Sequence, residues 1–184
     1  MIVIQAMKNF LIEGRPGIGK TTLLCRIAEL LSYMRIGGFY TKEIRENNNR
    51  VGFRIQTFSG QSGILSHISF QRGPYVGKYR VDVSQFEFIG VEALKDALKT
   101  SDLIFIDEIG KMELYSKRFQ ELVVNCFDSK SPVIATIMSR SHPFVDQIKS
   151  RKDVQRVEVT YENRDRLVNI LIEEMKNSSL TSNI

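Results

Sequence analysis

The chain has 184 residues, of which 42% are hydrophobic and 26% charged, an ordinary balance for a globular protein. This length suits one α/β domain, or one domain with an insertion, and is enough for a substantial core. No apolar run is long enough to span a membrane, and the uncharged start does not fit a secretory signal. Residues 1–6 are either an extra strand segment or a leader ahead of Met7.

The charge and the cysteines narrow the class of protein further. A net charge of +5 is compatible with nucleic-acid binding, but the cations are scattered, which favours an enzyme with an anionic substrate. Cys25 and Cys126 fall in helical patterns beside apolar residues, so we expect buried, reduced thiols. With two histidines and no Cys/His cluster, we expect no zinc site, and the expected compartment is the cytoplasm.

A glycine-rich loop at residues 14–21 follows the first predicted strand, 9–12. Apolar residues then recur at helical spacing over 20–34, so we expect strand, loop and a helix that stops at the glycines 37–38. The loop fits G-x-x-x-x-G-K-[ST], the Walker A phosphate-binding motif. The sequence therefore predicts a nucleotide-binding loop at the start of a helix.

The chemistry of this motif gives each position a role. Backbone N–H groups surround phosphate oxygens, the lysine contacts the β- and γ-phosphates, and the hydroxyl completes the coordination of Mg²⁺. We therefore expect Lys20 to act in catalysis on the phosphates and Thr21 to bind the metal. The residues expected to bind the nucleotide here are Gly14, Arg15, Pro16, Gly17, Ile18, Gly19, Lys20, Thr21 and Thr22.

An antiparallel β region is predicted after the first helix. Residues 39–45, 51–58 and 64–68 have strand character and are separated by polar turns. Between residues 69 and 80 the apolar pattern is lost. That stretch is either a mobile basic loop that meets phosphate or a solvated loop, and its cations are Arg72, Lys78 and Arg80.

A strand over 79–83 and a helix capped by Ser84 and ending near Lys99 come next. Residues 103–106 then form the most apolar run and lead directly into two acids, Asp107 and Glu108. This pattern is typical of a buried parallel strand that carries carboxylates to the binding edge of a sheet. We expect Asp107 to hold the metal and Glu108 to polarise the attacking water as a general base.

The remaining elements alternate between helix and strand. We expect a helix after Ser116, a strand over 132–137, a short helix around 144–148, a strand over 154–159 and a closing helix that gives way to a frayed tail, 177–184. This order predicts a parallel sheet with helices on both faces.

Several polar residues follow these strands and are weaker candidates. Lys111 either offsets γ-phosphate charge or is solvated. Thr136, or Ser139 with Arg140, is placed to sense the γ-phosphate, and Asn163 with Arg164 to touch the base. All of these residues lie at or just past the end of a predicted strand.

Six segments, taken together, resemble those of a known family. In chain order they are Gly14–Thr22, Gly38–Glu43, Val51–Ile55, the Val-Gly-Lys-Tyr string 76–79, the Asp-Glu-Ile-Gly-Lys-Met-Glu string 107–113, and Glu162–Arg164. The chain resembles the small P-loop nucleoside-triphosphatase family that includes thermophile members and the cancer-related nucleoside-triphosphatase. The resemblance covers about residues 8–175.

The resemblance implies a single P-loop NTPase domain over residues 1–184. Its fold would be a three-layer α/β structure with a mostly parallel, RecA-like central sheet and an antiparallel β insertion over about 39–83. It also implies a Mg²⁺-dependent hydrolase of several nucleoside triphosphates. We expect the protein to be a monomer. Asp107, Glu108, Ile109 and Gly110 would then contact the nucleotide, with Glu108 as the catalytic acid.

Two other functions stay open at this point. The cations of residues 72–80 suit a lid of a kinase that transfers the γ-phosphate to a nucleotide or another small acceptor. The basic composition suits a nucleotide-switched nucleic-acid-binding module, which requires affinity that falls steeply with salt.

Overall fold

The computed structural model describes residues 9–181, so the prediction for residues 1–6 and the last part of the predicted tail lie outside the described residues. The strands are β1 (Asn9–Glu13), β2 (Ile36–Glu46), β3 (Asn49–Thr57), β4 (Ser62–His67), β5 (Tyr75–Val76), β6 (Tyr79–Val81), β7 (Leu103–Ile109), β8 (Val133–Ile137) and β9 (Val154–Glu158). The helices are α1 (Lys20–Leu30), α2 (Val83–Phe86), α3 (Glu92–Thr100), α4 (Lys117–Asp128), α5 (Pro143–Lys149) and α6 (Arg164–Thr181), with a π-helical turn η1 (Glu87–Val91) and a 3-10 turn η2 (Glu113–Tyr115).

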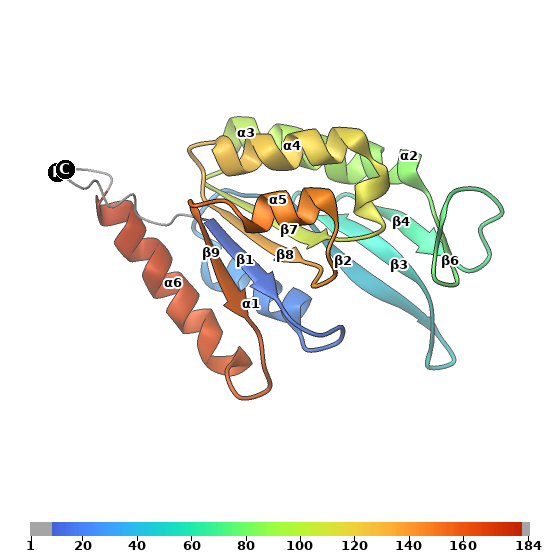
Figure 1. Cartoon of the computed structure of the whole chain (residues 1–184), viewed down its shortest axis with the longest axis horizontal. Helices are drawn as coiled ribbons and strands as arrows, with labels where there is room; N and C mark the ends of the chain where they lie inside the picture. Colours follow the sequence, from blue (N-terminus) through green and yellow to red (C-terminus); the bar gives the residue numbers. More distant parts are fainter. Residues whose placement is uncertain (1–8, 182–184) are drawn as a thin grey trace.

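All of these strands form one mixed sheet in the order β5-β6-β4-β3-β2-β7-β8-β1-β9. The half from β2 to β9 is parallel, as predicted for the core. The predicted β insertion extends the same sheet, because β3 pairs antiparallel with β2, and β4 and β6 follow outward. The long β2–β3 hairpin projects beyond the parallel strands (Figure 1).

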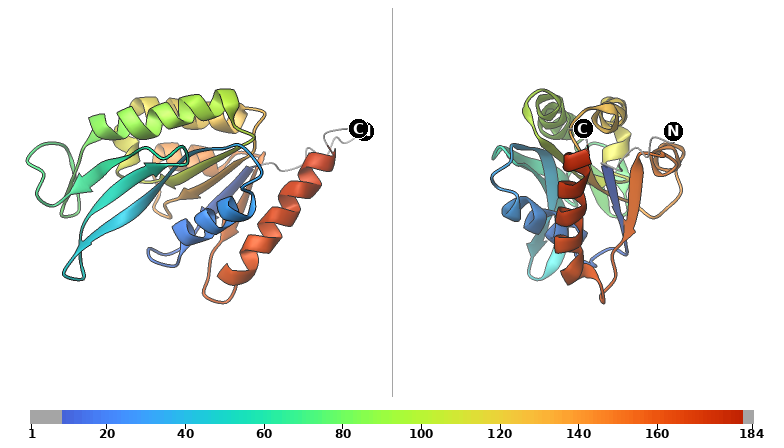
Figure 2. Two further views of the ribbon diagram at one scale, coloured as in Figure 1. Left: turned by 180° about the vertical axis from the view of Figure 1, so that it is seen from behind. Right: turned by 90° about the vertical axis from the view of Figure 1, so that its left-hand side faces the viewer.

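Helices cover both faces of the sheet, which gives three layers (Figures 1 and 2). One core lies under α2, α3, α4 and α5, and includes Phe39, Phe86 and Phe119, whose ring centroids lie 5.2–6.1 Å apart. The other lies under α1 and α6 and includes Leu24 and Leu171. Full burial of one of these side chains contributes about 1.5–3 kcal/mol to the stability of the fold. The two helical layers therefore hold the sheet between them in place.

Strand β7 explains the most apolar run of the sequence. It lies between β2 and β8, and all four residues 103–106 are fully buried. Ile104 and Ile106 pack into the first core, whereas Leu103 and Phe105 pack into the second. Since both faces of a central parallel strand are covered, both sets of side chains must be apolar.

The prediction that glycines 37–38 end the first helix is wrong. Helix α1 ends at Leu30, and both glycines lie within β2, which begins at Ile36. Gly38 has φ +97°, and a β-carbon there would overlap the carbonyl oxygen of Phe105. Glycine is therefore needed for the close approach of β2 to β7 and not for a helix cap.

Four other sequence predictions change in detail. Asp82, not Ser84, caps α2, because its side chain accepts a hydrogen bond of 2.8 Å from the backbone N–H of Gln85. The predicted strand over 79–83 is present as β6, and it pairs with β5, which lies in the stretch predicted to lack an apolar pattern. The closing helix α6 continues to Thr181, past the predicted start of the tail. Cys25 and Cys126 are free thiols, but only Cys126 is fully buried.

No helix within residues 9–181 is long and apolar enough to cross a membrane.

Candidate functional site

The glycine-rich loop lies between the end of β1 and the start of α1, as predicted. Gly19 precedes the helix with φ +105°, a conformation that side-chain-bearing residues rarely adopt. The Nζ atom of Lys20 donates a hydrogen bond of 3.0 Å to the carbonyl oxygen of Gly14, so the lysine folds back across the loop. The backbone N–H groups and the positive end of the helix dipole thus meet at an anion site.

Asp107 is the centre of the hydrogen-bond network opposite this loop. Only 2% of its surface is exposed. Its Oδ2 atom accepts a hydrogen bond of 2.8 Å from the hydroxyl of Thr21 and one of 3.2 Å from the backbone N–H of Thr41. Its Oδ1 atom accepts one of 2.6 Å from the hydroxyl of Thr136. Strands β2, β7 and β8 and helix α1 therefore fix this carboxylate together.

The predicted partners of the metal, Thr21 and Asp107, are thus brought together. Within residues 9–181, no group of three or more His, Cys, Asp or Glu side chains could hold a metal ion by itself. A donor set of one hydroxyl and one carboxylate fits Mg²⁺, which is typically held by one or two protein oxygens, substrate phosphates and water. It does not fit a permanently bound structural metal.

Glu108 follows Asp107 and lines a hollow of about 370 Å³ beside the phosphate loop. Burial raises the pKa of the Glu108 carboxyl above its ordinary value; the positive charge of Lys20 opposes this rise and the charge of Asp107 adds to it. A carboxylate with a raised pKa is a stronger base than an exposed one, which suits proton abstraction near neutral pH.

The walls of this hollow come from distant parts of the chain. Its polar side chains are Lys20, Thr41, Glu108, Lys111, Glu113, Ser139 and Arg140. Its apolar side chains are Pro16, Phe53, Leu65, Val76, Met112 and Met138. An adjoining hollow of about 350 Å³ shares Val76, Lys111 and Met138 and extends to Tyr75, Tyr115 and His142. The β insertion thus supplies one wall of the site.

The candidate γ-phosphate sensors separate into two groups. Ser139 and Arg140 line the hollow, as does Lys111. Thr136 is fully buried and is engaged with Asp107. Thr136 therefore holds the Asp107 carboxylate in place from the neighbouring strand β8.

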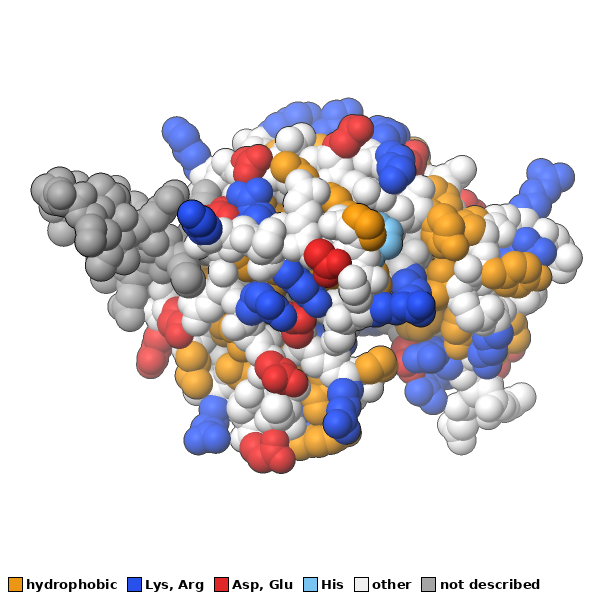
Figure 3. Space-filling model, in the orientation of Figure 1, with side chains coloured by type: hydrophobic (Ala, Val, Ile, Leu, Met, Phe, Trp, Pro, Cys, Tyr) orange, Lys and Arg blue, Asp and Glu red, His pale blue; other side chains and the backbone are white. Residues whose placement is uncertain are grey.

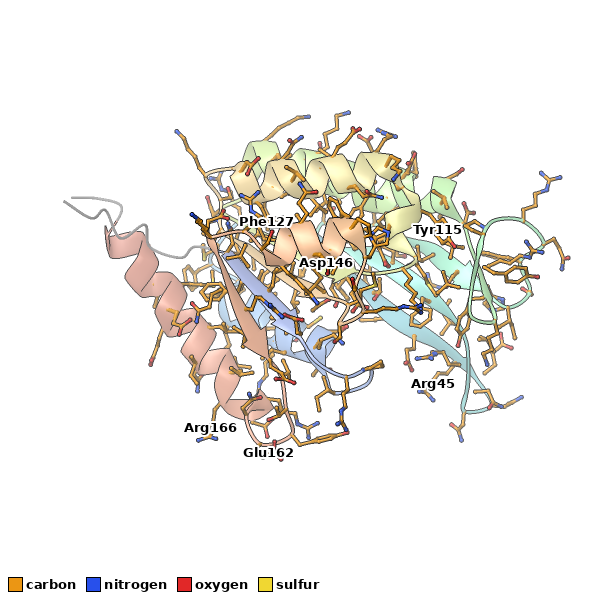
Figure 4. The ribbon with its side chains drawn as sticks, in the orientation of Figure 1. Arg45, Tyr115, Phe127, Asp146, Glu162 and Arg166 are labelled. Carbon is orange, nitrogen blue, oxygen red and sulfur yellow. The ribbon has the colours of Figure 1, made fainter. Side chains whose placement is uncertain are left out.

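The cations of the β5–β6 hairpin do not line the hollow. The guanidinium of Arg80 lies 3.9 Å from the centroid of the Tyr75 ring and donates to the carbonyl oxygen of Gly73. Lys78 lies over the ring of Tyr79. The hydroxyl of Tyr115, labelled in Figure 4, donates to the carbonyl oxygen of Tyr75 at 3.2 Å and joins η2 to the hairpin.

Asn163 and Arg164, the predicted base contacts, are used locally at the start of α6. Asn163 accepts from the backbone N–H of Thr160 and donates to the carbonyl oxygen of Glu158, each at 2.8 Å. The guanidinium of Arg164 lies 5.4 Å from the Tyr161 ring centroid. Figure 4 shows the neighbouring labelled residues Glu162 and Arg166 at the outer end of the β9–α6 connection.

Glu13 directly precedes the phosphate loop, but its charge is neutralised. Its carboxylate pairs with Lys149 at 2.8 Å and with Arg156 at 2.6 Å. Although burial raises its pKa, hydrogen bonds from Arg156 and Lys149 outweigh that effect and hold the pKa below its ordinary value. On the face drawn in Figure 3, Lys and Arg side chains are spread among acids and do not form one continuous basic surface.

Two residues of the site were not assigned a role from the sequence. Thr41 lies inside a predicted strand, where nothing distinguishes it from other strand threonines. Glu113 belongs to the quoted 107–113 string and is only 5% exposed. Burial, and then the charge of Glu108, raises the pKa of Glu113 to about 8. The one available sequence signal was that Glu113 ends the 107–113 string, whose other residues had mostly been assigned to the site.

Comparisons with known proteins agree with this geometry. The model of a family described as NTPase matches residues 9–172. The nucleoside-triphosphatase THEP1 of Thermotoga sp. (strain RQ2) is 48% identical over 168 residues, which cover 91% of this chain and 95% of the relative.

Solved structures show the same relationship. The crystal structure of THEP1 from the hyperthermophile Aquifex aeolicus has a TM-score of 0.82 and 40% identity, covering 89% of this chain and 96% of the other. The solution structure of a human cancer-related nucleoside triphosphatase has a TM-score of 0.78 and 35% identity, covering 90% and 96%.

Proposed function

The chain belongs to the NTPase family and is a nucleoside-triphosphatase, and from that premise we propose that it hydrolyses ATP, GTP and other nucleoside triphosphates to the diphosphate and phosphate with Mg²⁺. The observation that carries the proposal is the pair Asp107–Glu108 at the end of β7, opposite the phosphate loop. Asp107 meets Thr21 at 2.8 Å, and Glu108 lines the hollow beside Lys20.

Each residue has a distinct part in this reaction. The loop 14–21 binds the triphosphate through its backbone N–H groups. Lys20 exchanges its bond to the Gly14 carbonyl for the β- and γ-phosphates and offsets their charge. Mg²⁺, bound beside Thr21 and Asp107, would supply further charge neutralisation on the phosphates. Thr41 and Thr136 hold Asp107 in position.

Glu108 completes the reaction as the general base. The oxygen of a water molecule attacks the γ-phosphorus, the bond from that phosphorus to the bridging oxygen breaks, and the proton of the water passes to the Glu108 carboxylate. Glu108 lines the same hollow as Lys20, which supports a position near the γ-phosphate. The carboxylate is partly buried, so little bulk solvent competes for that proton.

Loose base preference is part of this proposal. Asn163 and Arg164 are engaged in the β9–α6 connection. Such a site binds the nucleotide mainly through its phosphates. It discriminates poorly among bases, because specificity requires contacts that differ from one base to another.

Phosphate release across the four common nucleoside triphosphates with Mg²⁺ tests the proposal. Glu108→Gln is expected to keep nucleotide affinity and lose turnover, whereas Lys20→Ala is expected to weaken binding itself. Glu121→Gln removes one carboxylate from the exposed surface of α4 and is the matched control. Unchanged phosphate release by Glu108→Gln contradicts the assigned role.

The size of the hollow supports a second candidate, phosphoryl transfer to a small acceptor. About 370 Å³ is far more than one attacking water requires, and Phe53, Leu65 and Met138 give it apolar walls. An acceptor hydroxyl in place of water would give transfer by the same chemistry. Incubation with a panel of nucleoside monophosphates and analysis for newly formed diphosphates tests this. The candidate fails if all γ-phosphate appears as free phosphate.

A further inference from the structure

Glu113 is a buried acid that the hydrolytic mechanism does not use. It begins the turn η2, only 5% of its surface is exposed, and its side chain lines the hollow that contains Lys20 and Glu108. The backbone N–H groups of Glu113 and Gly110 donate hydrogen bonds to its carboxyl group, but the desolvation of a buried acid is still costly. The retention of an acid therefore requires an explanation.

Gly110 locates the Glu113 carboxyl relative to the general base. A β-carbon at position 110 would lie 3.1 Å from Oε2 of Glu113 and 3.2 Å from Oε2 of Glu108. One oxygen atom of each carboxyl group therefore lies next to Gly110, where the absence of a side chain avoids tight contacts with both.

Electrostatics make these two acids chemically unlike. Burial, followed by the charge of Glu108, raises the pKa of Glu113 to about 8, so this group carries its proton at neutral pH. The charges of Glu108 and Asp107 from β7 raise this pKa, whereas hydrogen bonds from the backbone N–H groups of Glu113 and Gly110 oppose the rise. The cations Lys20, Lys111 and Arg140 line the same hollow. A protonated carboxyl beside a carboxylate is a hydrogen-bond donor, not a competing base.

We propose that Glu113 is a positioning residue for Glu108: its neutral carboxyl group donates a hydrogen bond to the Glu108 carboxylate and orients it toward the attacking water. This inference rests on the proposed role of Glu108 as general base. Glu113 does not touch the phosphates and acts on turnover only through Glu108.

Two substitutions separate this role from simple support of the turn. Glu113→Gln replaces the neutral acid with an amide of the same shape that still donates a hydrogen bond. Glu113→Leu keeps much of the volume and removes the donor. We expect Glu113→Gln to retain kcat within about 3-fold. Glu113→Leu should lose about 10- to 100-fold in kcat at unchanged KM, because a misoriented base costs up to about 10²-fold.

The dependence of kcat on pH adds a readout that a structural role would not change. In the wild type, ionisation of Glu113 near pH 8 places two carboxylates side by side, and kcat should fall. Glu113→Gln cannot ionise, so this alkaline fall should be absent. The measurement is steady-state phosphate release with MgATP for the wild type, both Glu113 variants and Glu108→Gln, with folding checked by circular dichroism.

Different results would refute the role of Glu113 and the role of Glu108. Any of three results overturns the role of Glu113. The first is a wild-type kcat in folded Glu113→Leu, and the second is a loss of kcat in Glu113→Gln as large as that in Glu113→Leu. The third is an alkaline fall in the kcat of Glu113→Gln that matches that of the wild type. Wild-type turnover in Glu108→Gln overturns the proposed general base itself. If Glu113→Leu does not fold, the Gln variant and the pH profile still decide the question.

Discussion

The buried acid Glu113 should make folding stability depend on pH, and Glu113→Gln should remove that dependence. The pKa of this carboxyl is raised from an ordinary value near 4.5 to about 8 in the folded protein. The folded chain therefore holds a proton that the unfolded chain releases between these values. The stability linked to this proton is fully present below the unfolded pKa and is lost as the pH rises through the folded pKa.

The size of the effect follows from the width of this interval. Each unit of pKa difference corresponds to about 1.4 kcal/mol, so the whole interval corresponds to roughly 4–5 kcal/mol. Between about pH 5.5 and about pH 8.5 the free energy of unfolding of the wild type should fall by about 3 kcal/mol, and that of Glu113→Gln should not show this fall. The Gln variant should therefore gain on the wild type as the pH rises.

Urea unfolding at several pH values measures this difference directly. Glu121→Gln, on the exposed surface of α4, changes charge equally and should follow the wild-type curve. Free energies of unfolding for Glu113→Gln and the wild type that run parallel across the range would refute the reasoning. They would show that Glu113 is ionised in the folded protein.

Three further predictions address other parts of the fold and the site. Thr136→Val removes a fully buried donor to Asp107 at 2.6 Å and should cost about 1.5–3 kcal/mol in urea unfolding; no loss would show that the bond is inconsequential. Gly38→Ala should destabilise by several kcal/mol more than Gly60→Ala, since both have φ +97° but only Gly38 meets a backbone carbonyl of β7; equal losses would contradict the close approach. Lys20→Ala should weaken nucleotide binding in calorimetry, and unchanged affinity would remove its phosphate role.

The phosphate loop and the strand with Asp107 could be predicted because their signals are local. The loop needs glycine, lysine and threonine at fixed spacing in one segment, and β7 needs a continuous apolar run that ends in acids. The partners of Asp107 could not be predicted in this way. Thr41 and Thr136 come from β2 and β8, the strands on either side of β7, so their contacts with the carboxylate depend on how distant segments pair in the sheet.

The same limit explains the errors in the fold. Glycines 37–38 have the form of a helix stop, but their cause is the approach of β2 to β7, which depends on a residue far along the chain. Composition alone also left two interpretations of the cations of residues 72–80, a phosphate-contacting loop or a solvated one. Arg80 and Lys78 contact tyrosine rings of their own hairpin, and the hairpin contributes the apolar Val76 to the wall of the hollow.

The central claim is that the loop 14–21 and Glu108 form two halves of one hydrolytic site. Binding and turnover measured on one preparation of Glu108→Gln, beside Glu121→Gln, test it most directly. We expect MgATP affinity within about 3-fold of the wild type and a loss in kcat of about 10²- to 10⁴-fold, the usual contribution of a general base. Phosphate release by Glu108→Gln at the wild-type rate would contradict it.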